Sequence, residues 1–152
     1  MRQPLIALGL LACAAASCST GTEPDIATTV FAPSLGVDLA SMTRTSTGLY
    51  YKDLVVGNGP VVASGQQVAI HYVGNFPNGL QFDANGPAET PFSFRLGTGQ
   101  VIAGFDQGVA GMRVTGRRQI IIPPALGYGS QATGSIPPNS ILVFTIDVVS
   151  AQ

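Results

Sequence analysis

Few side chains in this chain of 152 residues are suited to covalent or metal chemistry. His71 is the only histidine, so the sequence offers no histidine cluster for a metal ion. His71 and Tyr72 are adjacent in an alternating pattern typical of a strand, so they face opposite sides, and we expect His71 to be structural. Residues 96–99 read Leu-Gly-Thr-Gly, but Ile102 stands where a dinucleotide-binding loop has its third glycine. Because no Gly-x-Ser-x-Gly nucleophile motif occurs either, the sequence favours a site that works by shape and desolvation.

Residues 1–17 have the pattern of an export signal. Met1 and Arg2 precede an uncharged apolar run over residues 5–16. This run is shorter than the about 20 residues that a membrane-spanning helix needs. A basic residue, a short apolar stretch and small residues before a cleavage point are typical of a secretory signal peptide. We therefore predict that residues 1–17 are a signal peptide and that the protein is exported.

Residues 15–18, Ala-Ala-Ser-Cys, resemble the lipobox of bacterial lipoproteins, in which the cysteine becomes the lipidated first residue. The resemblance implies lipidation of Cys18 and anchoring to the membrane, facing the periplasm. Ser19 and Thr20 follow Cys18 in place of the aspartate typical of inner-membrane retention, which favours the outer membrane. Two alternatives stay open: a competing box that ends at Cys13, and ordinary signal-peptidase cleavage that leaves a periplasmic protein without a lipid.

The composition excludes several other classes. Seven Lys or Arg residues against eight Asp or Glu residues give a net charge of −1, so there is no cationic surface for nucleic acid. Both cysteines lie at or before position 18, so the mature chain can have neither a disulfide framework nor a cysteine metal site. The 19 Gly and 11 Pro residues follow no period and predict a turn-rich domain. No heptad pattern indicates a dimerising helix, and we expect a monomer.

The remaining chain divides into a linker and a domain. Residues 18–46 are rich in Thr, Ser, Pro, Ala and Gly, which predicts a flexible linker. Residues 47–152 form the predicted domain, in which short alternating runs separated by turn residues predict strands. The predicted strands are 49–56, 68–73, 80–83, 92–96, 117–122 and 141–149. Arg117 and Arg118 are expected to be the solvated start of a strand.

One segment has a helical period instead. Four apolar residues recur at helical spacing and predict a helix over residues 102–111: Val101, Phe105, Val109 and Met112. Gly104 and Gly108 each cost such a helix about 1 kcal/mol relative to alanine, so it should form only when packed against a sheet. The expected fold class is α+β, an antiparallel sheet of five or six strands wrapped around one short amphipathic helix.

Seven segments, all in register, closely resemble the FKBP family of peptidyl-prolyl cis-trans isomerases. The segments are 70–74 (Ile-His-Tyr-Val-Gly), 82–83 (Phe-Asp), 91–94 (Pro-Phe-Ser-Phe), 100–105 (Gln-Val-Ile-Ala-Gly-Phe), 108–112 (Gly-Val-Ala-Gly-Met), 122–129 (Ile-Pro-Pro-Ala-Leu-Gly-Tyr-Gly) and 136–144 (Ile-Pro-Pro-Asn-Ser-Ile-Leu-Val-Phe). Each segment is weak alone, but their shared order makes chance agreement negligible. The resemblance implies the same fold that the periodicities predict.

The resemblance also implies an apolar pocket between the helix and the sheet, with no metal and no cofactor. Its implied catalytic residues are Tyr72, Phe82, Asp83, Ile102 and Tyr128, and its implied substrate-binding residues are Phe92, Val101, Phe105, Ile136 and Phe144. Phe105 stands where many members have tryptophan, which implies a slightly deeper pocket. Ala88 stands where some members have an arginine that braces the aspartate, so we expect Tyr72 to hold Asp83. Ser135 stands where members of the family commonly have an apolar residue before Ile136.

The implied activity is rotation of X-Pro peptide bonds in unfolded or exported polypeptides, without a covalent intermediate. An alternative is a non-catalytic chaperone or peptide-binding module with the same fold. Retention of the five implied catalytic residues favours the enzyme. The short loop between Gly74 and Leu80 disfavours a dedicated chaperone flap.

Overall fold

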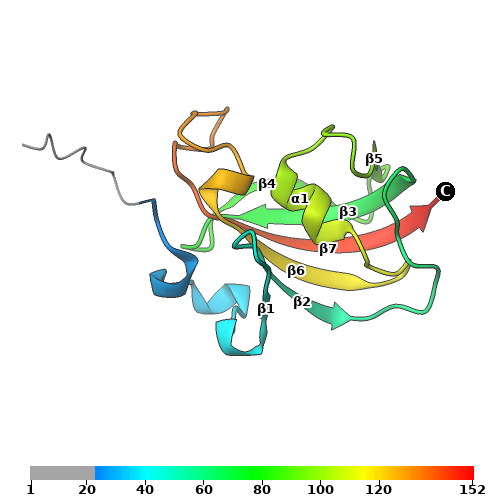
Figure 1. Ribbon diagram of the computed structural model, residues 1–152, viewed down its shortest axis with the longest axis horizontal. Helices are drawn as coiled ribbons and strands as arrows, with labels where there is room; N and C mark the ends of the chain where they lie inside the picture. Colours follow the sequence, from blue (N-terminus) through cyan, green and yellow to red (C-terminus); the bar gives the residue numbers. More distant parts are fainter. Residues whose placement is uncertain (1–22) are drawn as a thin grey trace, which may run out of the picture.

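The computed structural model describes residues 23–152 (Figure 1), so the predicted signal peptide and Cys18 lie outside the described residues. Within residues 23–152, one α-helix, α1 (Ala103–Val109), accompanies seven strands. The strands are β1 (Thr43–Arg44), β2 (Tyr50–Val55), β3 (Gln67–Asn75), β4 (Gln81–Asn85), β5 (Phe92–Arg95), β6 (Arg117–Ile122) and β7 (Leu142–Ala151). Short 3₁₀ helices are η1 (Ile26–Thr28), η2 (Pro33–Leu35), η3 (Leu39–Ser41) and η4 (Pro124–Leu126). Along residues 23–152, no helix is both long and apolar enough to cross a membrane.

All strand pairs are antiparallel, and the sheet has the order β1-β2-β6-β7-β3-β4, with β5 paired to β3. The six strands expected from alternation are all present, and the predicted α+β fold is confirmed. The seventh strand, β1, comes from the segment that was expected to be a linker. Figure 1 shows α1 lying over the strands in the middle of this sheet.

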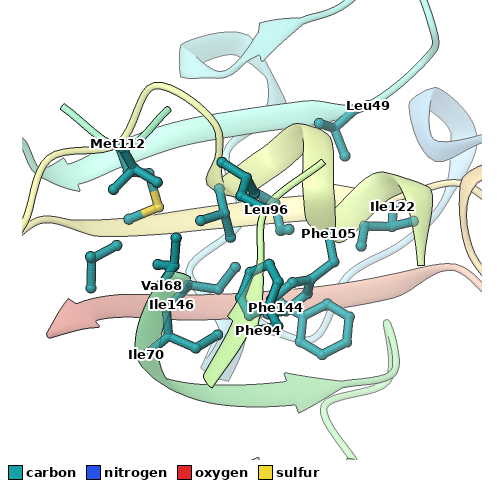
Figure 2. Packing of buried hydrophobic residues seen from close by; sticks show 14 of the residues in the cluster. Leu49, Val68, Ile70, Phe94, Leu96, Phe105, Met112, Ile122, Phe144 and Ile146 are labelled. Atoms are coloured by element: carbon teal, nitrogen blue, oxygen red, sulfur yellow. The ribbon is translucent and has the colours of Figure 1, made fainter. Parts of the chain in front are cut away.

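The main core fills the space between α1 and one face of the sheet. Alternation along β7 turns Leu142, Phe144 and Ile146 into this core. Phe94 and Met112, which follow the same apolar patterns, are also nearly fully buried. Figure 2 shows Phe94, Phe144 and Ile146 between the helix and β7.

Two glycines let the helix approach the sheet closely. A Cβ atom at Gly104 would lie 2.5 Å from Cγ2 of Ile122, and one at Gly108 would lie 2.7 Å from Cδ1 of Ile120. Both isoleucines lie on β6 and are fully buried. The glycines that weaken the isolated helix are therefore what allows it to pack on β6.

Arg118 differs from the sequence-based expectation of a solvated strand start. Its side chain is only 8% exposed and forms two hydrogen bonds with the Asp53 carboxylate, at 2.7 and 3.1 Å. Its Nη1 also donates to the carbonyls of Gly108 and Ala110, at the carboxyl end of α1. A guanidinium there interacts favourably with the helix dipole. Arg117, by contrast, is exposed as predicted and pairs with Asp147.

The flexible linker predicted over residues 18–46 is not what the structure has over 23–46. These residues, here called the N-terminal strap, run across the outer face of the sheet through η1, η2, η3 and β1. Ile26 of the strap is buried against Ile121 and Val143. The partly buried strap residues on this second core are Phe31, Leu35, Val37, Leu39 and Met42. The Gln119 side chain, which is buried, donates a 2.8 Å hydrogen bond to the Leu35 carbonyl. The segment was predicted to be flexible because its composition is rich in Ser and Pro, and composition does not show these apolar contacts.

Candidate active site

A cavity of about 650 Å³ opens between α1 and the sheet. All ten residues that the sequence assigned to the pocket line it: Tyr72, Phe82, Asp83, Phe92, Val101, Ile102, Phe105, Tyr128, Ile136 and Phe144. They come from strands β3, β4, β5 and β7, from α1 and the residues just before it, and from the loop between η4 and β7. The topology thus brings together residues that are far apart in the sequence.

Buried aromatic rings form the floor of the cavity. Phe105 and Phe144 are each 5% exposed, and their ring centroids lie 5.1 Å apart in an edge-to-face arrangement. The Tyr72 ring meets both of them edge-on, at 5.9 and 6.1 Å. Phe94 supports Phe105 from the core side at 5.8 Å, and Figure 2 shows Phe94, Phe105 and Phe144 clustered together. Such mutual edge-to-face contacts hold the rings in fixed orientations.

Phe82 forms one wall, and a glycine on β3 sets its position. The Phe82 and Phe144 rings meet edge-to-face at 5.5 Å. Gly74 lies beside both rings, and a Cβ atom there would be 2.8 Å from Cζ of Phe82 and 2.8 Å from Cε1 of Phe144. Only a residue without a side chain therefore leaves room for this wall at its present place.

Tyr72 and Asp83 form the polar pair of the site. The Tyr72 hydroxyl donates a 2.7 Å hydrogen bond to Oδ2 of Asp83, and the Ala84 N–H donates to Oδ1. Burial, and then the bond to Asp83, raise the pKa of Tyr72 above its ordinary value. The phenol therefore stays a donor at neutral pH and fixes the carboxylate. This arrangement is the one expected for a chain with Ala88 in place of a bracing arginine.

Two hydrogen-bonding groups at the cavity remain available to a bound peptide. Within residues 23–152, no protein group bonds the Ile102 N–H or the Tyr128 hydroxyl. Tyr128 follows η4 between two glycines and is half-buried, whereas Phe92 stands at the mouth with 40% exposure. A peptide in the cavity can thus meet apolar side chains below and hydrogen-bonding groups beside them.

Further lining residues were not assigned to the site from the sequence: Gly99, Gln100, Thr133, Gly134 and Ser135. They lie in loops, where no periodicity marks which side chains face inward. Gln100 is also a loop brace, because its Oε1 accepts a 2.8 Å hydrogen bond from the Arg95 N–H. Of these five, only Ser135 stands out in the sequence, as a polar residue where the family commonly has an apolar one.

His71 and the Gly-x-Gly loop, the other features that the sequence raised as candidates, have structural roles. His71 faces away from the cavity, and its Nδ1 lies 3.0 Å from the Asn85 side-chain oxygen. The Gly-x-Gly loop, residues 97–99, is bound by Asp106 of α1, whose carboxylate accepts hydrogen bonds from the N–H groups of Gly97 and Gly99. In the described part of the chain, no three His, Cys, Asp or Glu side chains are close enough to hold a metal ion.

Comparison with known proteins agrees with this geometry. Residues 59–149 match the family described as FKBP-type peptidyl-prolyl cis-trans isomerase. The chain is 50% identical over 105 residues to the FK506-binding protein of Streptomyces anulatus, covering 67% of this chain and 85% of that protein. It is 47% identical over 112 residues to FK506-binding protein 4 of Dictyostelium discoideum, covering 73% of this chain and 30% of that protein. The crystal structure of FkpA from Escherichia coli superposes with a TM-score of 0.68 at 33% identity, covering 74% of this chain and 52% of that one.

An aromatic cavity between a short helix and an antiparallel sheet, together with these matches, assigns the chain to the FKBP-type peptidyl-prolyl cis-trans isomerase family. The matched residues 59–149 include α1 and every residue that lines the cavity. The chain spans roughly a quarter to a third of the length of several of the curated relatives that it matches.

Proposed function

We propose that this protein catalyses the rotation of X-Pro peptide bonds by binding the twisted imide more tightly than the planar one. The observation that supports this most is the cavity itself, in which four buried or half-buried rings enclose an apolar floor beside free hydrogen-bonding groups. We assign Phe105, Phe144, Phe92, Val101 and Ile136 to the prolyl ring and its neighbours. This assignment, and the catalytic roles below, rest on position in the cavity and on family resemblance.

The barrier to be lowered comes from the amide itself. Rotation about a peptide bond costs about 18–20 kcal/mol because resonance keeps the bond planar. Water stabilises the charge-separated resonance form of the planar imide, and that separation is lost when the bond twists. An apolar cavity removes this solvation and therefore favours the twisted form. A thousandfold acceleration requires only about 4 kcal/mol of such preference.

The polar groups orient the peptide around the bond that turns. The Ile102 N–H and the Tyr128 hydroxyl hydrogen-bond the carbonyls that flank the proline. Phe82 and Asp83 face the imide carbonyl as it rotates, and Tyr72 holds Asp83 in place. No bond to carbon forms or breaks, and no proton needs to move.

A protease-coupled assay on a short chromogenic X-Pro peptide tests this function. We expect the purified chain to accelerate the cis-to-trans step at micromolar concentration. Tyr128→Phe removes one hydroxyl and should lower kcat/KM by about threefold to tenfold, the equivalent of one hydrogen bond. Tyr50→Phe is the matched control, because Tyr50 faces the N-terminal strap, and it should retain full activity.

If a chain that is folded by circular dichroism does not accelerate isomerisation of the peptide, the proposed enzyme activity is refuted. If such a chain still suppressed aggregation of an unfolded protein, the function would be that of a peptide-binding chaperone. Equal losses in Tyr128→Phe and Tyr50→Phe would contradict the site assignment.

We also propose that the protein is an exported lipoprotein that acts, as a monomer, on exported proline-containing polypeptides. The supporting pattern is the apolar run over residues 5–16 followed by small residues and Cys18. Anchoring at the periplasmic side of the outer membrane accords with Ser19 and Thr20 after the cysteine. Its clients would be proteins that fold after export, where X-Pro isomerisation is slow.

Labelling with radioactive palmitate in a bacterial host tests the anchor, and Cys13 provides a matched control. We expect Cys13→Ala to be labelled and Cys18→Ala to be unlabelled. Label that persists in Cys18→Ala but disappears in Cys13→Ala would move the anchor to Cys13. An unlabelled but exported wild-type chain would indicate ordinary signal-peptidase cleavage.

A further inference from the structure

The turn between β3 and β4 carries a ring that supports the cavity from behind. Phe76 is absent from the cavity lining, but its ring lies 4.9 Å from that of Phe82. The turn is closed by backbone hydrogen bonds from the Phe76 N–H to the Leu80 carbonyl at 2.8 Å and from the Gly79 N–H to the Phe76 carbonyl at 2.9 Å. The position of this turn therefore sets the position of Phe76, and Phe76 backs the Phe82 wall.

The N-terminal strap docks onto the same turn. The Ala32 N–H donates a 2.7 Å hydrogen bond to the Pro77 carbonyl. The contact is close enough that a Cβ atom at Gly79 would lie 3.1 Å from the Cβ of Ala32 and 3.1 Å from the Oγ of Ser34. The strap is itself held to the sheet, since the Leu35 carbonyl accepts a 2.8 Å hydrogen bond from a buried glutamine.

The strap and the cavity also share one strand. Val143 of β7 lies under the strap in the second core, and the next residue, Phe144, forms the cavity floor. In the β3–β7 register, Val143 pairs with Asn75 and Phe144 pairs with Gly74. Movement of the strap therefore acts on the same part of the sheet from which Phe144 and the Phe76 turn project.

We propose that the N-terminal strap, residues 23–46, is a positioning element of the isomerase site, acting through its Ala32–Pro77 contact on Phe76 and thereby on Phe82. The strap lies entirely outside residues 59–149, the part of the chain that matches the family. The inference rests on the proposed catalytic role of Phe82. It makes Ala32 and Phe76 positioning residues for this site.

Ala32→Pro isolates the contact. Ala32 has φ −61°, which suits proline, so the substitution removes the donating N–H without forcing a new φ. Asp38→Ala is the matched control, because it removes the side-chain cap of η3 in the same strap, away from the turn. Both variants are made in the full chain and compared by kcat/KM, by urea unfolding and by NMR of ¹³C-labelled phenylalanine rings.

We expect Ala32→Pro to lower kcat/KM by about threefold to tenfold, because even a sub-ångström displacement of Phe82 changes the geometry around the bound imide and slows catalysis. The ring signals of Phe76 and Phe82 should shift. Asp38→Ala should lower the free energy of unfolding, measured in urea, by about as much as Ala32→Pro does. Its kcat/KM and its phenylalanine ring signals should stay at the wild-type values. Phe76→Leu, which leaves the strap contact intact, should lower kcat/KM as Ala32→Pro does.

Unchanged ring signals in Ala32→Pro would overturn the proposal, as would equal losses of kcat/KM in Ala32→Pro and Asp38→Ala. Full activity in folded Phe76→Leu would also overturn it. If the wild-type chain had no isomerase activity, the proposed function would fail separately. The ring signals would still report whether the strap positions Phe82.

Discussion

Replacing Gly74 by alanine separates the geometry of the active site from the stability of the fold. The added methyl would lie 2.8 Å from Cζ of Phe82 and 2.8 Å from Cε1 of Phe144. Carbon atoms in contact normally lie about 3.5–4.0 Å apart, so the ring edges must move by about 1 Å. Phe144 is 5% exposed and enclosed by other rings, whereas Phe82 is only half-buried. Most of the movement therefore falls on Phe82.

The two consequences of this movement differ in size. Overpacking costs about 1–3 kcal/mol, but alanine is favoured over glycine in a strand by about 0.5–1 kcal/mol, so the net destabilisation should be about 1 kcal/mol. Displacing a catalytic wall by about 1 Å can cost up to a hundredfold in rate. We therefore expect kcat/KM of Gly74→Ala to fall at least tenfold while the chain remains folded.

The assay is protease-coupled isomerisation of a short X-Pro peptide, with urea unfolding measured on the same samples. Gly86→Ala is the control, because Gly86 has no positive φ and no atom near the added methyl. It should keep full activity and gain about 0.4–1 kcal/mol through the unfolded state. Wild-type kcat/KM in Gly74→Ala would refute the argument that close ring placement is needed for turnover.

Three further predictions concern the helix, the buried arginine and the polar pair. Gly104→Ala should lower the free energy of unfolding by about 1 kcal/mol despite the better helix propensity of alanine. A double-mutant cycle with Ile122→Ala should show positive coupling between the two positions. A Gly104→Ala chain that is more stable than the wild type would contradict the close packing. Arg118→Met should lower the free energy of unfolding, measured in urea, by about 2 kcal/mol. This loss is smaller than that of a fully buried ion pair because Asp53 is partly exposed. An unchanged urea midpoint would show that the ion pair and the helix cap contribute nothing to stability. Because the folded-state pKa of Tyr72 is raised, its unfolded form ionises first, so stability should fall as pH rises above about 10. Tyr72→Phe should reduce that alkaline loss, and equal loss in both chains would count against the raised pKa.

The six strands β2 to β7 could be predicted because alternate residues of each strand turn apolar side chains toward the main core. Alternation in β7, for example, places Phe144 and Ile146 inward, and the structure has them there. The site residues could be predicted as a set only through family resemblance, since alternation alone does not distinguish a cavity wall from a core position. Phe94 and Phe144 illustrate this limit, because both alternate inward but only Phe144 lines the cavity.

The strap escaped prediction because it has no period. Its apolar residues, including Phe31 and Leu35, follow 3₁₀ turns and extended backbone, so they are spaced irregularly. Their partner surface nevertheless leaves a signal in the sequence. Residues 120–122 are three consecutive isoleucines, and a strand that is apolar on both faces is buried on both faces. The outward-facing Ile121 thus indicates a covering segment that composition alone does not reveal.

Helix α1 shows why the catalytic geometry depends on residues outside the cavity. A helix of seven residues with two glycines is unstable alone, so its position must come from its contacts. Gly104 allows close packing on Ile122, and Arg118 binds carbonyls at the opposite end of the helix. Between these contacts the helix carries Phe105, whose ring packs edge-to-face against Tyr72, Phe94 and Phe144. Strand β6 contributes no residue to the cavity lining, yet it determines where the floor of the cavity lies.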